Sequence, residues 1–73
     1  MNWIPAQYIG VREGFSRKGR PKQLFLFNVR GRILELHIST CTAPGRAKLQ
    51  RTLAALHNHK EVLVTNNRVL DVR

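Results

Sequence analysis

Hydrophobic residues occupy every second position on both sides of Arg30-Gly31 in the segment LFLFNVRGRILELHI, at Phe25, Phe27 and Val29 before it and at Leu34, Leu36 and Ile38 after it. A period of two is typical of β-strands, and a two-residue turn at Arg30-Gly31 would join two strands as a hairpin. In that register one side of the hairpin is apolar at its centre, as burial of one face requires. The predicted cross-strand pairs are Val29 with Arg32, Phe27 with Leu34, and Phe25 with Leu36.

The opposite side of this hairpin mixes apolar and polar residues, so it has the character neither of a core face nor of a solvent face. A mixed side of this kind is either partly covered by another part of the chain or available for contact with another protein. We predict such contact at three residues, Leu26, Ile33 and His37. The full set on this side is Leu24, Leu26, Asn28, Ile33, Glu35 and His37.

A helix is predicted from about Pro44 to Leu56. It follows STCTAPG, a segment rich in residues that cap helices, and proline is favoured in the first helical turn. Leu49, Leu53 and Leu56 follow one another at positions i, i+4 and i+7, which predicts that these three leucines form the buried stripe.

Shorter patterns complete the secondary structure. The segment WIPAQYIGV predicts a strand that is weakened at Pro5 and Gly10 and therefore lies at the edge of a sheet. Glycines, a serine and a proline interrupt any period between Arg12 and Lys22, which predicts a loop of about ten residues. The segment EVLVTNNRVLDV predicts a second hairpin around Asn66-Asn67, because asparagine tolerates the positive φ of tight turns.

The predicted fold class is therefore α+β, in the order β-loop-β-β-α-β-β, with antiparallel hairpins packed on one helix. The 73 residues are expected to form a single domain, residues 1–73. A domain of this size buries only about 60% of the surface of its unfolded chain, so the core is expected to be thin.

The excess of positive charge in the sequence indicates that this small fold has an anionic partner. Lys and Arg number 13 against 4 Asp and Glu, a formal net charge of +9. Clustered like charges repel one another, so folding alone gives little reason to gather them in FSRKGRPK. The basic residues predicted to contact the anionic partner are Arg17, Lys18, Arg20, Lys22, Arg30, Arg32, Lys48 and Arg51, of which Lys48 and Arg51 are expected on the exposed side of the helix.

Aromatic residues near the basic segment are candidates for stacking with unpaired bases. Phe15 and Tyr8 are the better candidates, because Phe25 and Phe27 are predicted in the core. The segment matches no sequence-reading motif, neither a zinc finger nor a phosphate-binding glycine loop nor the aromatic signature of an RNA-recognition sheet. It indicates where charge is gathered, and leaves open whether nucleic acid or an acidic protein surface meets it.

Other classes of function receive little support from the sequence. A zinc site at Cys41 with His37, His57 or His59 is disfavoured, because the last two histidines are spaced i, i+2 and do not share a helix face. We expect no metal, cofactor or catalytic residue. The start of the chain lacks the features of a signal peptide, and no run approaches a membrane span, so we expect a cytoplasmic monomer that does not bind membranes.

One enzymatic alternative remains, a small metal-independent ribonuclease. His37 would act as its base, because histidine titrates near neutral pH, and Arg32 or Lys22 would steady the phosphate. A second alternative is a free-standing module that binds RNA or DNA.

From MNWIPAQYIG to VLDVR, this short, basic, β-rich chain resembles the small transcription regulator made by lytic Xanthomonas phages. The resemblance implies a non-enzymatic protein that binds host RNA polymerase at the N-terminal region of the β′ subunit, near the RNA exit channel. It also implies inhibition of initiation and readthrough of intrinsic terminators, in the cytoplasm of the host cell. A basic surface at that place could hold phosphates of the nascent RNA.

Overall fold

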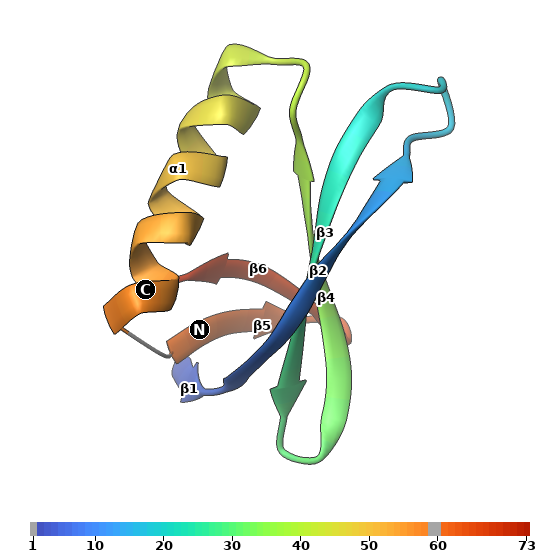
Figure 1. Cartoon of the computed structure of the whole chain (residues 1–73). Coiled ribbons are helices and arrows are strands. Elements are labelled where there is room, and N and C mark those ends of the chain that lie inside the picture. Colours follow the sequence, from blue (N-terminus) through green and yellow to red (C-terminus); the bar gives the residue numbers. More distant parts are fainter. Residues whose placement is uncertain (1, 59–60) are drawn as a thin grey trace.

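Two three-stranded antiparallel sheets and one helix form the protein in a computed structural model, which describes residues 2–58 and 61–73 (Figure 1). The larger sheet has the strand order β2-β3-β4, and the smaller sheet has the order β1-β5-β6. The predicted α+β class is confirmed. In chain order the elements are β1 Trp3–Pro5, β2 Gln7–Phe15, β3 Pro21–Val29, β4 Arg32–Ser39, α1 Ala43–Asn58, β5 Glu61–Thr65 and β6 Arg68–Val72.

The hairpin of β3 and β4 has the predicted turn and register. Arg30 and Gly31 have φ angles of 55° and 83°, as a two-residue turn between twisted strands requires. The paired residues include Val29 with Arg32, Phe27 with Leu34, and Phe25 with Leu36.

The second predicted hairpin is also present. Asn66 and Asn67 form its turn, with φ angles of 49° and 65°, and Thr65 pairs with Arg68 on either side of it. Side-chain amides make this left-handed conformation less costly for asparagine than for most residues.

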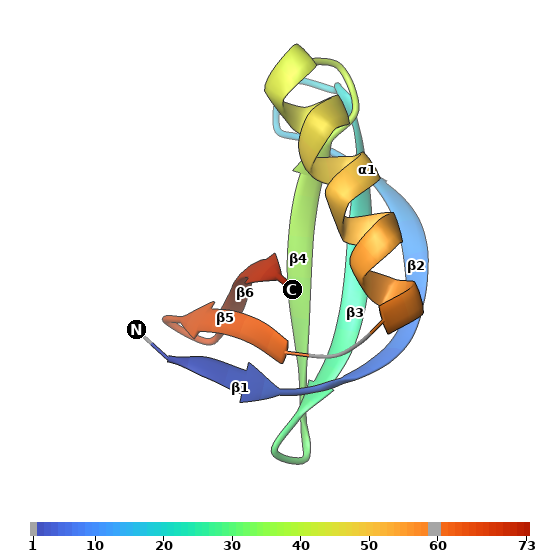
Figure 2. The same cartoon turned by 90° about the vertical axis from the view of Figure 1, so that its left-hand side faces the viewer.

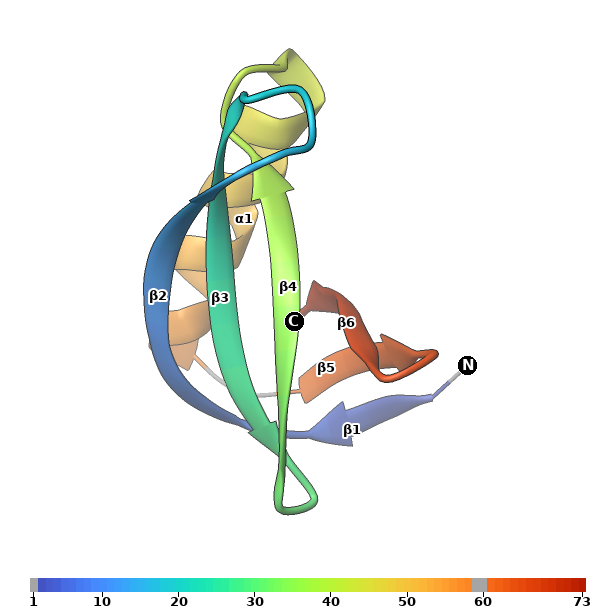
Figure 3. The same cartoon turned by 90° about the vertical axis from the view of Figure 1, so that its right-hand side faces the viewer.

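The core lies on one face of the larger sheet. We call this the helix-side face, because α1 lies across it (Figure 2). The smaller sheet covers the lower part of the same face, where Val62 and Val69 join the core. The opposite face, here called the outer face, is turned toward the viewer in Figure 3, where α1 lies behind the sheet. The strand register places the predicted protein-contact residues Leu26, Ile33 and His37 on this face. Buried residues of the core are Phe25, Phe27, Val29, Leu34, Leu36, Ile38, Val62 and Val69.

The helix begins as predicted but buries a different stripe. The Thr42 hydroxyl accepts a hydrogen bond from the Gly45 N–H at 3.1 Å, which satisfies one free donor of the first turn. The prediction for Leu53 was wrong: this side chain is 47% exposed, whereas Thr52 is fully buried. The buried stripe passes through Leu49, Thr52 and Leu56. The prediction failed because it chose the stripe by residue type, from the leucines, whereas the position around the helix axis that faces the core is that of Thr52.

The first predicted strand is two strands that belong to different sheets. The chain leaves β1 at Pro5 and enters β2 at Gln7, so β1 pairs with β5 while β2 pairs with β3. Both are edge strands, as predicted. A bulge at Ile9, between Tyr8 and Gly10, shifts the register of β2. The bulge places Tyr8 and Val11 on one face, although they are three residues apart.

The bounds of the predicted loop from Arg12 to Lys22 were wrong. β2 continues to Phe15 and β3 begins at Pro21, so the connection between them is Ser16–Arg20. β2 continues through Gly10 and Gly14 because it pairs with β3 along its whole length. Glycine weakens a strand, but the hydrogen bonds to the neighbouring strand keep this edge strand extended. Proline is acceptable as the first residue of β3.

Both ends of the chain take part in the smaller sheet. Trp3 of β1 pairs with Leu63 of β5, and β5 pairs in turn with β6. The Arg73 guanidinium lies 5.2 Å from the centre of the Trp3 ring, a cation–π contact between the two ends. Within the described residues, no helix has the length and apolar character needed to cross a membrane.

Replacing Gly45 by alanine is expected to lower the free energy of unfolding by about 1–3 kcal/mol. Alanine normally favours a helix over glycine, but a Cβ at this position would overlap the backbone carbonyl of Ser39. Urea unfolding followed by circular dichroism measures the difference. Gly10→Ala is the matched control, because no atom lies within 4 Å of a Cβ there, and equal losses for the two variants would contradict the overlap.

Candidate nucleic-acid interface

The four clustered basic residues of the sequence line one hollow of about 460 Å³ at the end of the larger sheet. Its lining residues come from the β2–β3 connection, the start of β3 and the end of β4. These segments lie at the top of Figure 3. Of the described residues, those that line it include no Asp or Glu. Positive charges therefore face this space without a carboxylate among them. We call it the basic hollow, and its lining residues are Ser16, Arg17, Lys18, Arg20, Pro21, Lys22, His37 and Ser39.

Hydrogen bonds give the connection Ser16–Arg20 a defined shape. The Ser16 N–H donates to the Arg20 carbonyl at 2.9 Å, and the Gly19 N–H donates to the Ser16 carbonyl at 2.9 Å. The Arg20 N–H donates to the Ser16 hydroxyl at 3.1 Å. Gly19 has a φ of 74°, which glycine adopts at no steric cost. The basic side chains thus start from an ordered turn rather than from an irregular loop.

His37 connects the basic hollow to the outer face through two hydrogen bonds. Lys22 Nζ lies 3.5 Å from His37 Nδ1, and His37 Nε2 lies 3.2 Å from Glu35 Oε2. An ammonium group can only donate, so Nδ1 accepts and Nε2 carries the proton that it donates to Glu35. Arg12 also approaches Glu35, with 3.7 Å between Nη2 and Oε1. One carboxylate therefore holds a histidine and an arginine from different strands.

The other predicted anion-contact residues do not join the basic hollow. Arg30 and Arg32 lie at the β3–β4 turn, at the opposite end of the sheet (Figure 1). Arg51 is exposed on α1. Lys48 is half-buried, and its Nζ donates to the Leu70 carbonyl at 2.7 Å. This contact ties the helix to β6, so Lys48 has a structural role in addition to its charge.

The three predicted protein-contact residues share the outer face of the larger sheet. Ile33 is 66% exposed and His37 is exposed, whereas Leu26 is half-buried. A smaller hollow of about 290 Å³ adjoins them, where Asn67 and Arg68 of the β5–β6 hairpin lie beside β4. The outer face is thus mixed in character, as predicted, and its contact with a protein stays a prediction.

The aromatic residues divide as the sequence predicted. Phe25 and Phe27 are buried, with exposed fractions of 1% and 3%. Phe15 is 71% exposed and directly precedes Ser16, which lines the basic hollow, although Phe15 itself lies on the helix-side face and is not part of that lining. Tyr8 lies at the other end of β2, with its ring centre 5.7 Å from that of Phe27. Phe15 is therefore the better placed of the two for stacking with a base.

Metal ligation finds no support in the part of the chain that the structure describes. Cys41 is exposed and its thiol lies 3.7 Å from the Pro21 carbonyl. No three His, Cys, Asp or Glu side chains gather as a metal site within residues 2–58 and 61–73. His59, one of the ligands considered above, lies outside the described residues.

Sequence reasoning missed two basic residues of the outer face, Arg12 and Arg68. Arg12 was assigned to the loop, and it reaches Glu35 only because β2 extends along β3. Arg68 comes beside Glu35 and His37 through packing between the two sheets. Proximity of Lys22 and His37, in contrast, follows from the β3–β4 register that the sequence did predict. Comparison with protein-family models, curated proteins and solved structures gave no match to this chain.

Proposed function

We propose that this protein is a non-enzymatic transcription regulator that binds host RNA polymerase and holds phosphates of the nascent RNA in the basic hollow. The observation that carries the RNA contact is the convergence of Arg17, Lys18, Arg20 and Lys22 on one space whose lining includes no carboxylate among the described residues. The polymerase partner, at the N-terminal region of β′, rests on the resemblance to the phage regulators.

The arrangement of the basic hollow suits a flexible, single-stranded anion. Arginine forks and lysine ammonium groups bind phosphate oxygens in different ways, so the hollow accepts a backbone without reading its sequence. Exposed Phe15 adds a surface on which one base can stack. RNA held in this way would be kept from forming the terminator hairpin, so readthrough would follow from electrostatics and geometry without a chemical step.

The outer face supplies a separate protein contact in this proposal. Ile33 and Leu26 offer apolar area, and the Glu35–His37 pair offers hydrogen-bonding groups beside it. Apolar area rimmed by polar groups is typical of protein interfaces. Because the outer face adjoins the basic hollow through His37, one bound protein could meet polymerase and RNA together.

The test of this function is purification of RNA polymerase from host lysate with the tagged protein after nuclease treatment. We expect stoichiometric recovery, because part of the affinity comes from a protein surface that digestion leaves intact. In purified transcription, near-stoichiometric protein should reduce initiation or increase readthrough at an intrinsic terminator. Ile33→Asp should weaken recovery and leave the fold intact, because this side chain is 66% exposed.

Two outcomes would contradict the proposal. If digestion releases the protein completely and transcription is unchanged, the free-standing RNA- or DNA-binding module becomes the better description. Non-specific phosphate binding has dissociation constants of about 10⁻⁴ to 10⁻⁶ M at physiological salt, so such a module would act only in large excess.

The ribonuclease alternative meets a geometric obstacle. Both ring nitrogens of His37 already have partners, Lys22 and Glu35, so neither is free to accept a proton from an RNA hydroxyl in this arrangement. Arg32, one of the two residues considered for steadying the phosphate, lies at the far end of β4. No observation therefore favours this function over RNA holding, and the absence of catalysis stays a prediction.

A further inference from the structure

The outward side of β2 is a free strand edge. β2 pairs with β3 alone within residues 2–58 and 61–73, and Figures 2 and 3 both show it at the border of the larger sheet. The strand spans Gln7–Phe15, nine residues, which is long for an unprotected edge. The backbone groups that β3 does not use point outward, where an added strand could pair with them.

An exposed apolar strip follows this edge on the helix-side face. Its members are Tyr8, Val11 and Phe15, which are 39%, 47% and 71% exposed. Their partners across β3 are Phe27, Phe25 and Pro21, and directly paired residues share a face, so the strip continues the core outward. The bulge at Ile9 is what aligns Tyr8 with the other two. We call these three residues the apolar strip.

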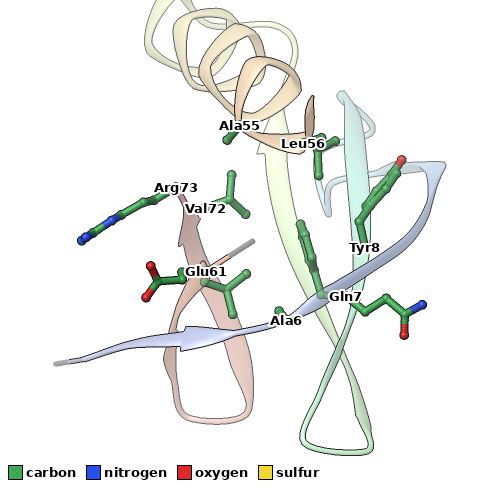
Figure 4. A pocket seen from close by; sticks show the side chains of 10 residues that line it. Ala6, Gln7, Tyr8, Ala55, Leu56, Glu61, Val72 and Arg73 are labelled. Atoms are coloured by element: carbon green, nitrogen blue, oxygen red, sulfur yellow. The ribbon is translucent and has the colours of Figure 1, made fainter. Parts of the chain in front are cut away.

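A cavity of about 340 Å³ opens at the Tyr8 end of the apolar strip. Figure 4 shows it between the end of α1, the start of β2 and the smaller sheet, with the side chains of Gln7 and Arg73 directed away from it. Apolar pockets of this kind receive the anchor side chains of binding partners. Glu61 also lines the cavity, and the side chains that give it its apolar character are Ala6, Tyr8, Phe27, Ala55, Leu56, Val62 and Val72.

The two faces of β2 differ in charge. On the outer face Arg12 stands between Gly10 and Gly14, and Lys22 is the cross-strand partner of Gly14. The single carboxylate of β2, Glu13, is exposed on the helix-side face. An added strand would therefore meet apolar side chains, interrupted by Glu13, on one face and the positive charge of Arg12 and Lys22 on the other. A strand that alternates apolar and acidic residues matches both faces.

We infer that the free edge of β2 binds an extended, acidic segment of a partner protein by β-strand addition, with one apolar side chain of that segment in the cavity. Main-chain hydrogen bonds would supply affinity, and the two faces would supply selectivity. A second copy of this chain fits less well, because each copy carries a net charge of +9 and the two would repel. This surface meets the basic hollow at its Phe15 end, where Lys22 belongs to both, but the inference does not depend on the proposed function.

The test uses a capped synthetic peptide of about ten residues, a typical strand length, in which valine and glutamate alternate around one central phenylalanine. It is titrated into the ¹⁵N-labelled protein while amide shifts and amide hydrogen exchange are recorded. We expect saturable binding, with the largest shift changes in Gln7–Phe15 and around the cavity, and slower exchange of the outward amides of β2. A peptide with lysine in place of glutamate should bind at least about tenfold more weakly.

Val11→Glu should weaken peptide binding about tenfold, because a like charge then faces the peptide and apolar contact is lost. Ile33→Glu is the matched control: it makes the same change of charge at another exposed β-branched residue, on the other face, and should change affinity by less than about twofold. Amide spectra of both variants report whether the fold is kept, and the exchange measurement on the unmodified protein needs no variant.

Several results would overturn the inference. They are no binding at millimolar peptide, shift changes confined to Ser16–Arg20, equal weakening by Val11→Glu and Ile33→Glu, or dimers that pair through β2 in sedimentation. The last result would assign the edge to a second copy. RNA holding is read from RNA binding by variants of the basic hollow, a separate measurement, so the two proposals fail separately.

Discussion

Replacing Arg17, Lys18, Arg20 and Lys22 together by glutamine is expected to lower the salt dependence of RNA binding sharply. Each phosphate neutralised on a single strand contributes about 0.7 to the slope of log affinity against log salt, so loss of four contacts lowers the slope by up to about 3. Binding of a fluorescent single-stranded RNA, measured by anisotropy over a range of salt concentrations, gives both slopes. The variant should also bind the RNA more weakly than the unmodified protein at low salt.

The matched control removes four charges from outside the basic hollow, with glutamine at Arg30, Arg32, Arg46 and Arg51. Both variants lower the formal net charge of +9 by four, so a general effect of charge would change both slopes equally. We expect the control to lower the slope by less than about 1, because screening weakens charges far from the bound strand. Equal slopes for the two variants would show that the basic hollow is an ordinary solvated surface.

Phe25→Ala is expected to lower the free energy of unfolding by about 3–5 kcal/mol. Phe25 is 1% exposed and lies opposite Leu36 at the centre of the hairpin, so its removal leaves a cavity that a small core cannot refill. Urea unfolding followed by circular dichroism measures the loss. For a domain of 60–100 residues each kcal/mol corresponds to roughly 4–8 °C in Tm, so thermal unfolding should also shift strongly.

Phe15→Ala provides the comparison for the same side chain in an exposed place. Phe15 is 71% exposed, so its removal should change the free energy of unfolding by less than about 0.5 kcal/mol. The same variant should weaken RNA binding if the ring stacks with a base. Losses of similar size for the two phenylalanines would contradict the burial of Phe25 and the exposure of Phe15.

The features that sequence predicted best are those fixed by neighbours in the chain. The Arg30-Gly31 turn and the register of β3 with β4 follow from a two-residue connection and from apolar residues that meet only in one alignment. The Asn66-Asn67 turn was likewise predicted from the residues of the turn itself, which adopt the positive φ of a tight hairpin. In both hairpins the turn conformation and the burial pattern demand the same structure, so local sequence is sufficient.

Features that depend on distant parts of the chain were missed or misplaced. The end of β2 was predicted too early, because its glycines and its bulge interrupt the alternating pattern by which a strand is recognised in a sequence. The strand nevertheless continues to Phe15, because β3 supplies its hydrogen-bonding partners. The predicted buried face of α1 included Leu53 instead of Thr52. The face that is buried depends on how the helix packs against the sheet, which the local sequence does not determine. For the same reason the sequence located the charge of the basic hollow but not its link to Arg12 through Glu35.

The smaller sheet also determines the order in which the chain can fold. β1 pairs with β5, so residues near positions 3 and 63 must meet, whereas β3 and β4 are joined by two residues. The entropy lost on closing a loop increases with its length, so the β3–β4 hairpin can form early while the smaller sheet waits for nearly the whole chain. During synthesis, β1 therefore leaves the ribosome long before its partner strand β5 exists, and the smaller sheet can form only after β5 and β6 have emerged.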